Sequence, residues 1–173
     1  MSSAALAFAA YHQRPFSHRL GAFVTDLKDR SNAQRENILR AGAKINGKIL
    51  QSQEVFSLNG TAGPYTEEKG YRPERSFRGQ GVVFTPGGGV CQVASTLYNT
   101  AKKSDLEILE RVPHTQAVSS VPRGLDATLA FGVADLKFRN KHPYPIKIIA
   151  RDLNNQLLIE IWGKENKHGR YDQ

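Results

Sequence analysis

The pattern of apolar and polar positions is clearest between residues 92 and 104, where it has the period of a helix. Val93, Leu97 and Ala101 recur at a spacing of four, so they lie on one face of that helix. Two lysines follow in its last turn, where positive charge suits the helix dipole. The apolar face predicts that this helix packs against a sheet.

A second helix is predicted to begin at Ser31. Ser31 and Gln34 fit a capping box, in which each side chain satisfies the other's free backbone N–H. Gly47 ends the periodic segment. The chain before residue 31 shows no clear period, and we expect it to be partly ordered at best.

The remaining apolar segments are short and rich in β-formers. The clearest are 146–150 and 157–162, with Asp152, Asn154 and Asn155 between them, and they predict a hairpin. Further strand-like segments lie at 48–58, 106–111, 117–121, 127–133 and 135–140. Helices combined with mostly antiparallel strands predict an α+β fold, in which the helix that carries the cysteine packs on the sheet formed with the C-terminal hairpin.

Three parts are expected along the 173 residues: an N-terminal extension (1–30), one domain (31–163) and a polar tail (164–173). A short apolar patch at Ala4–Ala10 contains an A-x-A pattern, so the extension is either the remnant of an export signal or a frayed leader. A complete signal peptide is not seen, because a basic n-region is missing. No run approaches the ~20 apolar residues of a membrane span. The location is therefore the cell envelope if the protein is exported, and the cytoplasm otherwise.

The formal net charge of +8 favours anionic partners, such as a cell-wall polymer. The basic residues are scattered rather than clustered, so a nucleic-acid site is not expected. A single cysteine excludes an intrachain disulfide and any site built from several cysteines. We expect no metal and no cofactor. The oligomeric state is not predicted.

A long loop from residue 59 to 81 is rich in glycine and proline and carries Tyr65 and Tyr71. Exposed loop aromatics can stack on a sugar or a peptide, and both tyrosines are candidates for substrate binding. The alternative is that they pin the loop to the core, and the sequence favours this alternative.

The candidate chemistry centres on Cys91, which three glycines precede and a predicted helix follows. A thiol at a helix N-terminus is pushed toward the thiolate. Backbone N–H groups around Gly88, Gly89 and Gln92, together with the Gln92 side chain, could hold an oxyanion. The competing interpretation is that a lone cysteine is a small buried apolar residue.

A reactive thiol needs a base and a group that orients the base. His114 follows Cys91 by 23 residues, beyond the helix and one strand. Asp126 and Asp135 come later, and we rank Asp126 first because it lies just after Gly124 at the mouth of a strand.

The chain resembles the VanW family, which takes its name from vancomycin-resistance gene clusters. The resemblance extends from about residue 31 to residue 163. It rests on RENILRAGAKING at 35–47, FSLN at 56–59, Gly70-Tyr71, GGGVCQVASTLYNTA at 87–101, Glu110-Arg111 with His114, GLDATL at 124–129 and DLKFRN at 135–140.

Some members of this family act as L,D-transpeptidases on bacterial peptidoglycan, with the motif cysteine as nucleophile. The resemblance implies that role for Cys91. We expect His114 to act as the base, and Arg111 is a further candidate for substrate binding. The expected partners are peptidoglycan stem peptides or an anionic wall polymer. The alternative is a non-catalytic module that binds the same material and is associated with glycopeptide resistance.

Overall fold

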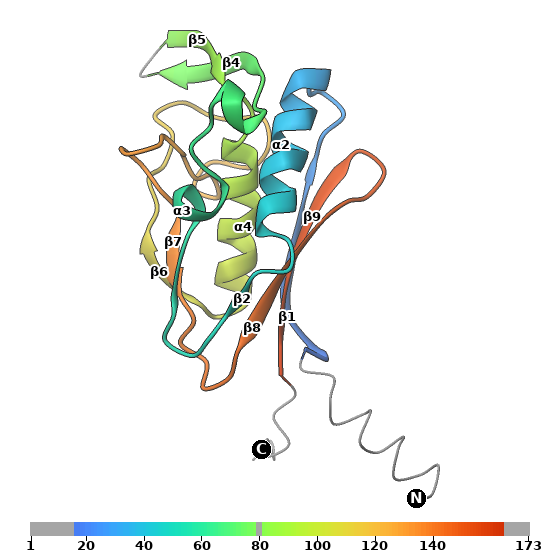
Figure 1. Cartoon of the computed structure of the whole chain (residues 1–173), viewed down its shortest axis with the longest axis vertical. Coiled ribbons are helices and arrows are strands. Elements are labelled where there is room, and N and C mark those ends of the chain that lie inside the picture. Colours follow the sequence, from blue (N-terminus) through green and yellow to red (C-terminus); the bar gives the residue numbers. More distant parts are fainter. Residues whose placement is uncertain (1–15, 79–80, 165–173) are drawn as a thin grey trace, which may run out of the picture.

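A computed structural model describes residues 16–78 and 81–164 and shows an α+β fold of helices and antiparallel sheets (Figure 1). The elements, in chain order, are β1 (His18–Asp26), α2 (Asn32–Ile45), β2 (Ile49–Leu50), β3 (Val55–Ser57), α3 (Leu58–Ala62), the 3₁₀ turn η1 (Glu67–Lys69), β4 (Pro73–Arg78), β5 (Gly81–Pro86), α4 (Cys91–Lys103), β6 (Glu107–Glu110), β7 (Lys137–Arg139), β8 (Ile146–Asp152) and β9 (Gln156–Gly163).

The strands form three sheets. The largest has the order β1-β9-β8-β2, the second β3-β7-β6, and β4 and β5 make a separate hairpin. Every pairing between strands is antiparallel. The predicted fold class is therefore confirmed.

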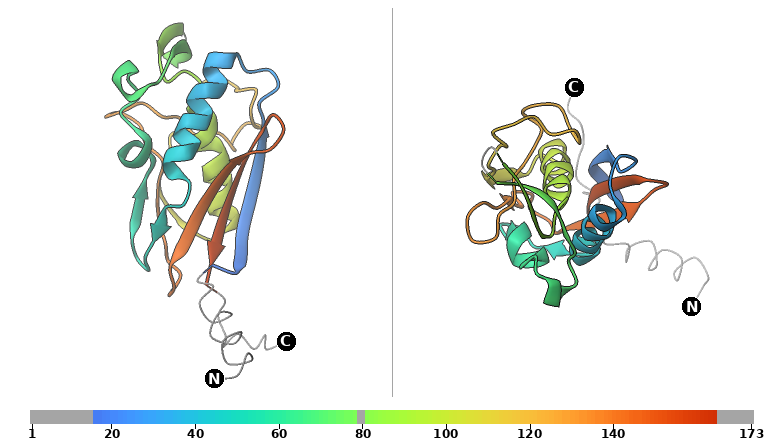
Figure 2. Two further views of the ribbon diagram at one scale, coloured as in Figure 1. Left: turned by 45° about the vertical axis from the view of Figure 1, so that its right-hand side comes forward. Right: turned by 90° about the horizontal axis from the view of Figure 1, so that it is seen from above.

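Helix α4 lies at the centre, between the large sheet and the second sheet, with α2 beside it (Figures 1 and 2). Val93, Leu97 and Ala101 are fully buried, as the helical period predicted. Polar residues of α4 are buried as well and bond to the large sheet. The Thr96 hydroxyl lies 2.8 Å from that of Thr25 in β1.

The capping box of α2 and the C-terminal hairpin are also confirmed. The Ser31 side chain accepts from the backbone of Gln34, and the Gln34 side chain accepts from that of Ser31. Asn154 and Asn155 in the hairpin turn have φ of 49° and 69°, which asparagine tolerates and which a type I′ turn requires.

Strand β1 is an element that the sequence did not predict. It runs along β9 from His18 to Asp26, and Leu27 after it is completely buried. Only Thr25 of the strand is buried, so β1 carries no clear alternation of apolar and polar residues. The apolar patch at 4–10 lies outside the described residues.

Two predicted strands, 117–121 and 127–133, are loops. Polar side chains on α4 bond to the backbone just before and within the second of these loops. The Ser95 hydroxyl accepts from the Ala127 N–H at 3.0 Å, and the Asn99 amide donates to the Leu125 carbonyl at 2.7 Å. The second loop therefore lies against α4. In the described residues, no helix has the length and apolar character needed to cross a membrane.

Candidate active site

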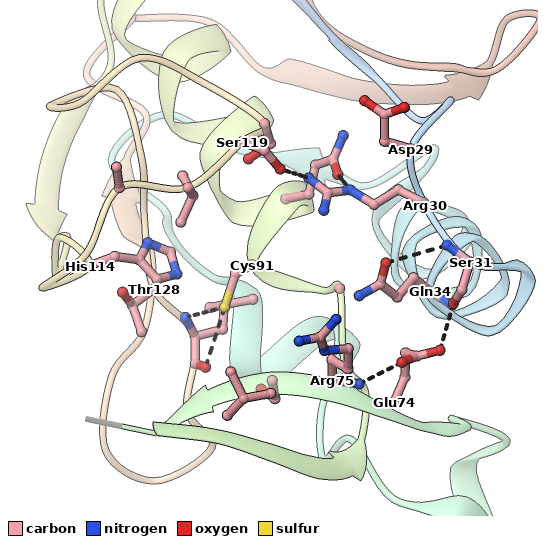
Figure 3. A pocket seen from close by; sticks show the side chains of 18 of the residues that line it. Asp29, Arg30, Ser31, Gln34, Glu74, Arg75, Cys91, His114, Ser119 and Thr128 are labelled. Carbon is pink, nitrogen blue, oxygen red and sulfur yellow. Dashed lines mark hydrogen bonds between the residues drawn. The ribbon is translucent and has the colours of Figure 1, made fainter. Parts of the chain in front are cut away.

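Cys91 is the first residue of α4, which confirms the predicted placement of the cysteine at a helix N-terminus. Gly87 (φ 88°) and Gly89 (φ 101°) adopt the left-handed region that glycine tolerates best. Val90 follows as the N-cap. The glycine turn brings the chain sharply into the helix and places Cys91 at its amino end (Figure 3).

The Cys91 thiol is turned toward the loop that follows Thr128. Its Sγ accepts from the Leu129 N–H at 3.3 Å and lies 3.7 Å from the Leu129 carbonyl oxygen. Burial raises the pKa of the Cys91 thiol, the Leu129 N–H offsets only part of that effect, and the charge of Asp126 adds to the rise. The direction of this pKa shift is therefore opposite to the expected shift toward thiolate, because burial outweighs the backbone hydrogen bonds to the sulfur.

His114 is fixed by Asp126. One carboxylate oxygen, Oδ2, accepts from the His114 backbone N–H at 2.6 Å and lies 2.9 Å from Nδ1 of its ring. The other oxygen accepts from Arg111 at 3.1 Å and from the Gly124 N–H at 3.2 Å. The side chains of His114 and Asp126 are 8% and 5% exposed, so water competes little for these contacts.

The charge state of Asp126 decides which ring nitrogen of His114 carries the proton. Burial alone would raise the pKa of Asp126, but the hydrogen bonds from His114 and the charge of Arg111 outweigh it and the pKa is lowered. An ionised carboxylate only accepts hydrogen bonds, so Nδ1 must donate. In the neutral ring Nε2 then keeps its lone pair.

Cys91 and His114 line one cavity of about 560 Å³. Figure 3 shows both side chains at the cavity, with no hydrogen bond drawn between them. The cavity is walled by the start of α2, the β4–β5 hairpin, the N-terminus of α4 and the loops 114–120 and 128–130. This arrangement places a thiol, and a base held by a carboxylate, at one cavity that can admit a ligand.

The carboxylate of Asp135, which we ranked second, is bonded elsewhere than to His114. It accepts from the Ser57 hydroxyl at 2.6 Å and from the Asn59 N–H at 2.9 Å, and so it holds the start of α3. Asp126 takes the place beside the imidazole. The ranking of the two carboxylates thus agrees with the geometry.

Two of the expected oxyanion donors are already engaged. The Gly88 N–H donates to the Thr85 carbonyl. A Cβ on Gly88 would lie 2.6 Å from the Glu74 backbone, so Gly88 is needed for close packing.

Gln92 is the second engaged donor. Its backbone N–H donates to the Gly89 carbonyl, and its side-chain amide donates to the Thr25 hydroxyl and to the Asp26 carbonyl. Gly89, the third residue expected to hold an oxyanion, lines the cavity, and its N–H makes no hydrogen bond to the part of the chain that the structure describes.

The tyrosines and Arg111 do not line the cavity. Tyr71 is 1% exposed and donates to the Ala62 carbonyl at 2.7 Å, which excludes direct stacking on a ligand. Tyr65 packs edge-on against Tyr71 and donates to Asn59. Burial raises the pKa of both hydroxyls. These aromatics pin the loop to the core, the alternative that the sequence favoured, and Arg111 holds Asp126.

Sequence reasoning missed Arg30 and Thr128, which both line the cavity. Arg30 lies in a segment without a period, so no pattern marked it. Thr128 lies two residues after Asp126, within a segment predicted to be a strand. Its Oγ1 is buried and has no hydrogen-bond partner among the described residues. Among the described residues, no group of three or more histidine, cysteine and acidic side chains is arranged to hold a metal ion.

The fold and the cavity define an α+β domain with a cysteine, a histidine and an aspartate at one site. The chain matches the family described as VanW like protein over residues 33–162, and it belongs to that family. It is 32% identical over 149 residues to the uncharacterized protein YoaR of Bacillus subtilis, covering 86% of this chain and 49% of YoaR.

It is also 27% identical over 109 residues to the vancomycin B-type resistance protein VanW of Enterococcus faecalis, covering 60% of this chain and 40% of that protein. The chain thus spans half or less of the length of these two relatives. No solved structure matches it significantly.

Proposed function

We propose that this domain is a cysteine acyl-transfer enzyme of the L,D-transpeptidase type that acts on peptidoglycan stem peptides in the cell envelope. The observation that carries the proposal is the shared cavity of Cys91 and His114, with Asp126 bound to the far side of the imidazole. Nucleophile, base and orienting carboxylate in this order are the parts that covalent acyl transfer needs.

In the first half-reaction, Cys91 Sγ attacks a carbonyl carbon of the donor peptide while Nε2 of His114 takes the thiol proton. The C–S bond forms, the C–N bond of the scissile peptide breaks, and His114 returns the proton to the departing amine. Backbone N–H groups at the glycine turn, with Gly89 as the candidate, hold the oxyanion meanwhile. The product is a thioester on Cys91 and a free terminal amino acid.

In the second half-reaction, an amine of another stem peptide attacks the thioester. A new C–N bond forms, the C–S bond breaks, and the proton of the amine returns to the sulfur through His114. Water in place of the amine gives a trimmed peptide instead of a cross-link.

The raised pKa of Cys91 shapes this mechanism. The thiol is protonated at rest and bonded to Leu129, so His114 acts as a true general base rather than as half of a preformed ion pair. We infer that the sulfur first rotates away from Leu129 when a donor peptide enters the cavity.

Membership in the VanW family supports a substrate from the cell wall, because one relative is a vancomycin B-type resistance protein. The net charge of +8 suits an anionic wall.

The proposal is tested by incubating the 173-residue chain with defined tetrapeptide stems and separating the products by mass. We expect release of the terminal amino acid, with a cross-linked dimer when an acceptor amine is present. The Cys91→Ala variant should give neither product. Absence of both products with the unaltered chain, over a range of stem peptides, would refute the enzyme.

A second candidate function is non-catalytic binding of the same peptides. The observation in its favour is the thiol itself, which burial keeps protonated and which two bonds to Leu129 already satisfy. In that case stem peptides bind equally well to the unaltered chain and to the Cys91→Ala variant, and no product appears.

A further inference from the structure

Arg30 presents a fixed positive charge to the cavity that holds Cys91. Its Nε donates to the Gln92 side-chain oxygen at 2.7 Å, and its Nη2 donates to the Ser119 hydroxyl at 3.2 Å (Figure 3). Both acceptors are neutral. These two hydrogen bonds therefore hold the side chain in place without an ion pair.

Gln92 makes this placement rigid. Its amide nitrogen donates to the Thr25 hydroxyl at 3.0 Å and to the Asp26 carbonyl at 2.8 Å, and the residue is 3% exposed. Gln92 also follows Cys91 directly on α4. Arg30 is thus tied to the residue next to the thiol, and its position relative to the thiol is set by the first turn of the helix.

No carboxylate in the described part of the chain forms an ion pair with Arg30. Burial lowers the pKa of the guanidinium, and the neighbouring charge of Asp29 raises it by less. A partly buried cation without an ion pair is unfavourable unless a ligand supplies the anion. Within residues 16–78 and 81–164, Nη1 makes no hydrogen bond, so Nη1 and the second proton on Nη2 remain for that anion.

We propose that Arg30 binds the C-terminal carboxylate of the acyl-donor peptide and so selects donors with a free carboxyl end. This rests on the proposed function for its substrate class. The planar guanidinium suits a carboxylate, which it can meet with two parallel hydrogen bonds. The terminal carboxylate belongs to the residue that leaves, so it lies close to the attacked carbonyl. Arg30 and Cys91 line the same cavity, so one peptide can meet both.

The residues around Arg30 then acquire distinct tasks. Gln92 and Ser119 are positioning residues, since they hold the guanidinium and do not themselves meet the carboxylate. The donor peptide would enter with its carboxyl end toward Arg30 and its attacked carbonyl toward Cys91.

The test compares a tetrapeptide stem that has a free C-terminus with the same peptide amidated there, and with a third peptide amidated only at its internal side-chain carboxylate. The rate of adduct formation on Cys91 is followed by intact mass. We expect about a ten- to hundredfold preference for a free C-terminus, the size of one charge-assisted pair. Internal amidation should have little effect.

The Arg30→Gln variant should lose this preference. Its rate of adduct formation should fall with the free peptide and stay unchanged with the terminal amide. Arg151→Gln removes one exposed positive charge that does not line the cavity, and it should behave like the unaltered chain. The proposal is overturned if the unaltered chain treats acid and terminal amide alike, or if its preference follows the internal carboxylate. An equal loss on both peptides in Arg30→Gln also overturns it.

Binding to the Cys91→Ala variant, measured by calorimetry, separates this proposal from the transfer reaction. The free peptide should bind more tightly than the amide, and Arg30→Gln in that background should remove the difference. This result would support the carboxylate site even where no adduct forms. If adducts form without any preference for a free C-terminus, the result supports acyl transfer and refutes the carboxylate site.

Discussion

Nδ1 of His114 lies 2.9 Å from Oδ2 of Asp126, and the same oxygen accepts the His114 backbone N–H at 2.6 Å. The carboxylate thus holds both the ring and the chain that carries it. This double contact fixes the tautomer with the proton on Nδ1 and leaves Nε2 for the substrate cavity.

The Asp126→Asn variant tests this relationship. An amide can donate to Nδ1, which would move the proton of the ring to Nε2 and remove the base. We expect the rate of acyl transfer to fall by a factor on the order of 10²–10⁴. The measurement is steady-state turnover of a stem peptide, with melting followed in parallel.

Asp135→Asn is the matched control, because Asp135 bonds to Ser57 and Asn59 rather than to His114. It should affect melting more than turnover per folded molecule. If Asp126→Asn turned over substrate at the unaltered rate, the imidazole would not depend on Asp126.

The pH dependence of thiol labelling follows from the raised pKa of Cys91. Thiolate is the reactive form, and an ordinary free thiol has a pKa of about 8.5. Labelling by iodoacetamide should therefore be slow at pH 7 and rise with a midpoint above about 8.5. Because Cys91 is the only thiol, the same chain unfolded in urea gives a clean reference, and it should label faster at pH 7.

His114→Ala should change this profile little if the resting thiol is neutral. Fast labelling at pH 6 that disappears in His114→Ala would show a thiolate–imidazolium pair instead. That outcome would contradict the neutral resting thiol, though it would leave His114 as the partner of Cys91.

The helix α4, the capping box of α2 and the C-terminal hairpin could be predicted because each has a strong local signal. Asp126 could be ranked above Asp135 on its place after a glycine. The lowered thiol pKa was predicted wrongly, since a helix terminus can be read from sequence whereas burial by the distant loop at Leu129 cannot.

Other differences between the predicted and the observed structure depend on contacts between residues that are far apart in the sequence. Strand β1 has a single buried residue, and only its long pairing with β9 makes it a strand. The loops 117–121 and 127–133 both have strand-like composition. In the second loop, the backbone N–H groups of Ala127 and Leu129 bond to side chains of α4 rather than to a strand. Arg30 is placed at the cavity by a hydrogen bond to Gln92, which lies 62 residues later, so no local pattern marks it as a site residue.

Packing at the glycine turn gives a pair of stability predictions. A Cβ on Gly88 would lie 2.6 Å from the Glu74 backbone, so Gly88→Ala must shift the turn or the β4–β5 hairpin and should cost about 1–3 kcal/mol of unfolding free energy. Gly42 lies inside α2, where a Cβ would make ordinary contacts of 3.7 and 3.8 Å. Gly42→Ala should therefore stabilise by about 0.5–1 kcal/mol.

Urea unfolding of both variants measures the two effects against the unaltered chain. A Gly88→Ala variant as stable as the original would show that the turn can relax without loss. In that case close packing would not be the reason for glycine at position 88.

The nucleophile is the central claim, and the mass of the intact chain after mixing with a defined tetrapeptide stem tests it most directly. We predict a thioester adduct on the unaltered chain and none on Cys91→Ser, with similar melting of both, because serine is nearly isosteric and suits a helix start. Serine in that place has a far higher pKa and is a much weaker nucleophile. An unaltered chain that forms no adduct, or a well-folded Cys91→Ser variant that turns over peptide at the original rate, would contradict the account.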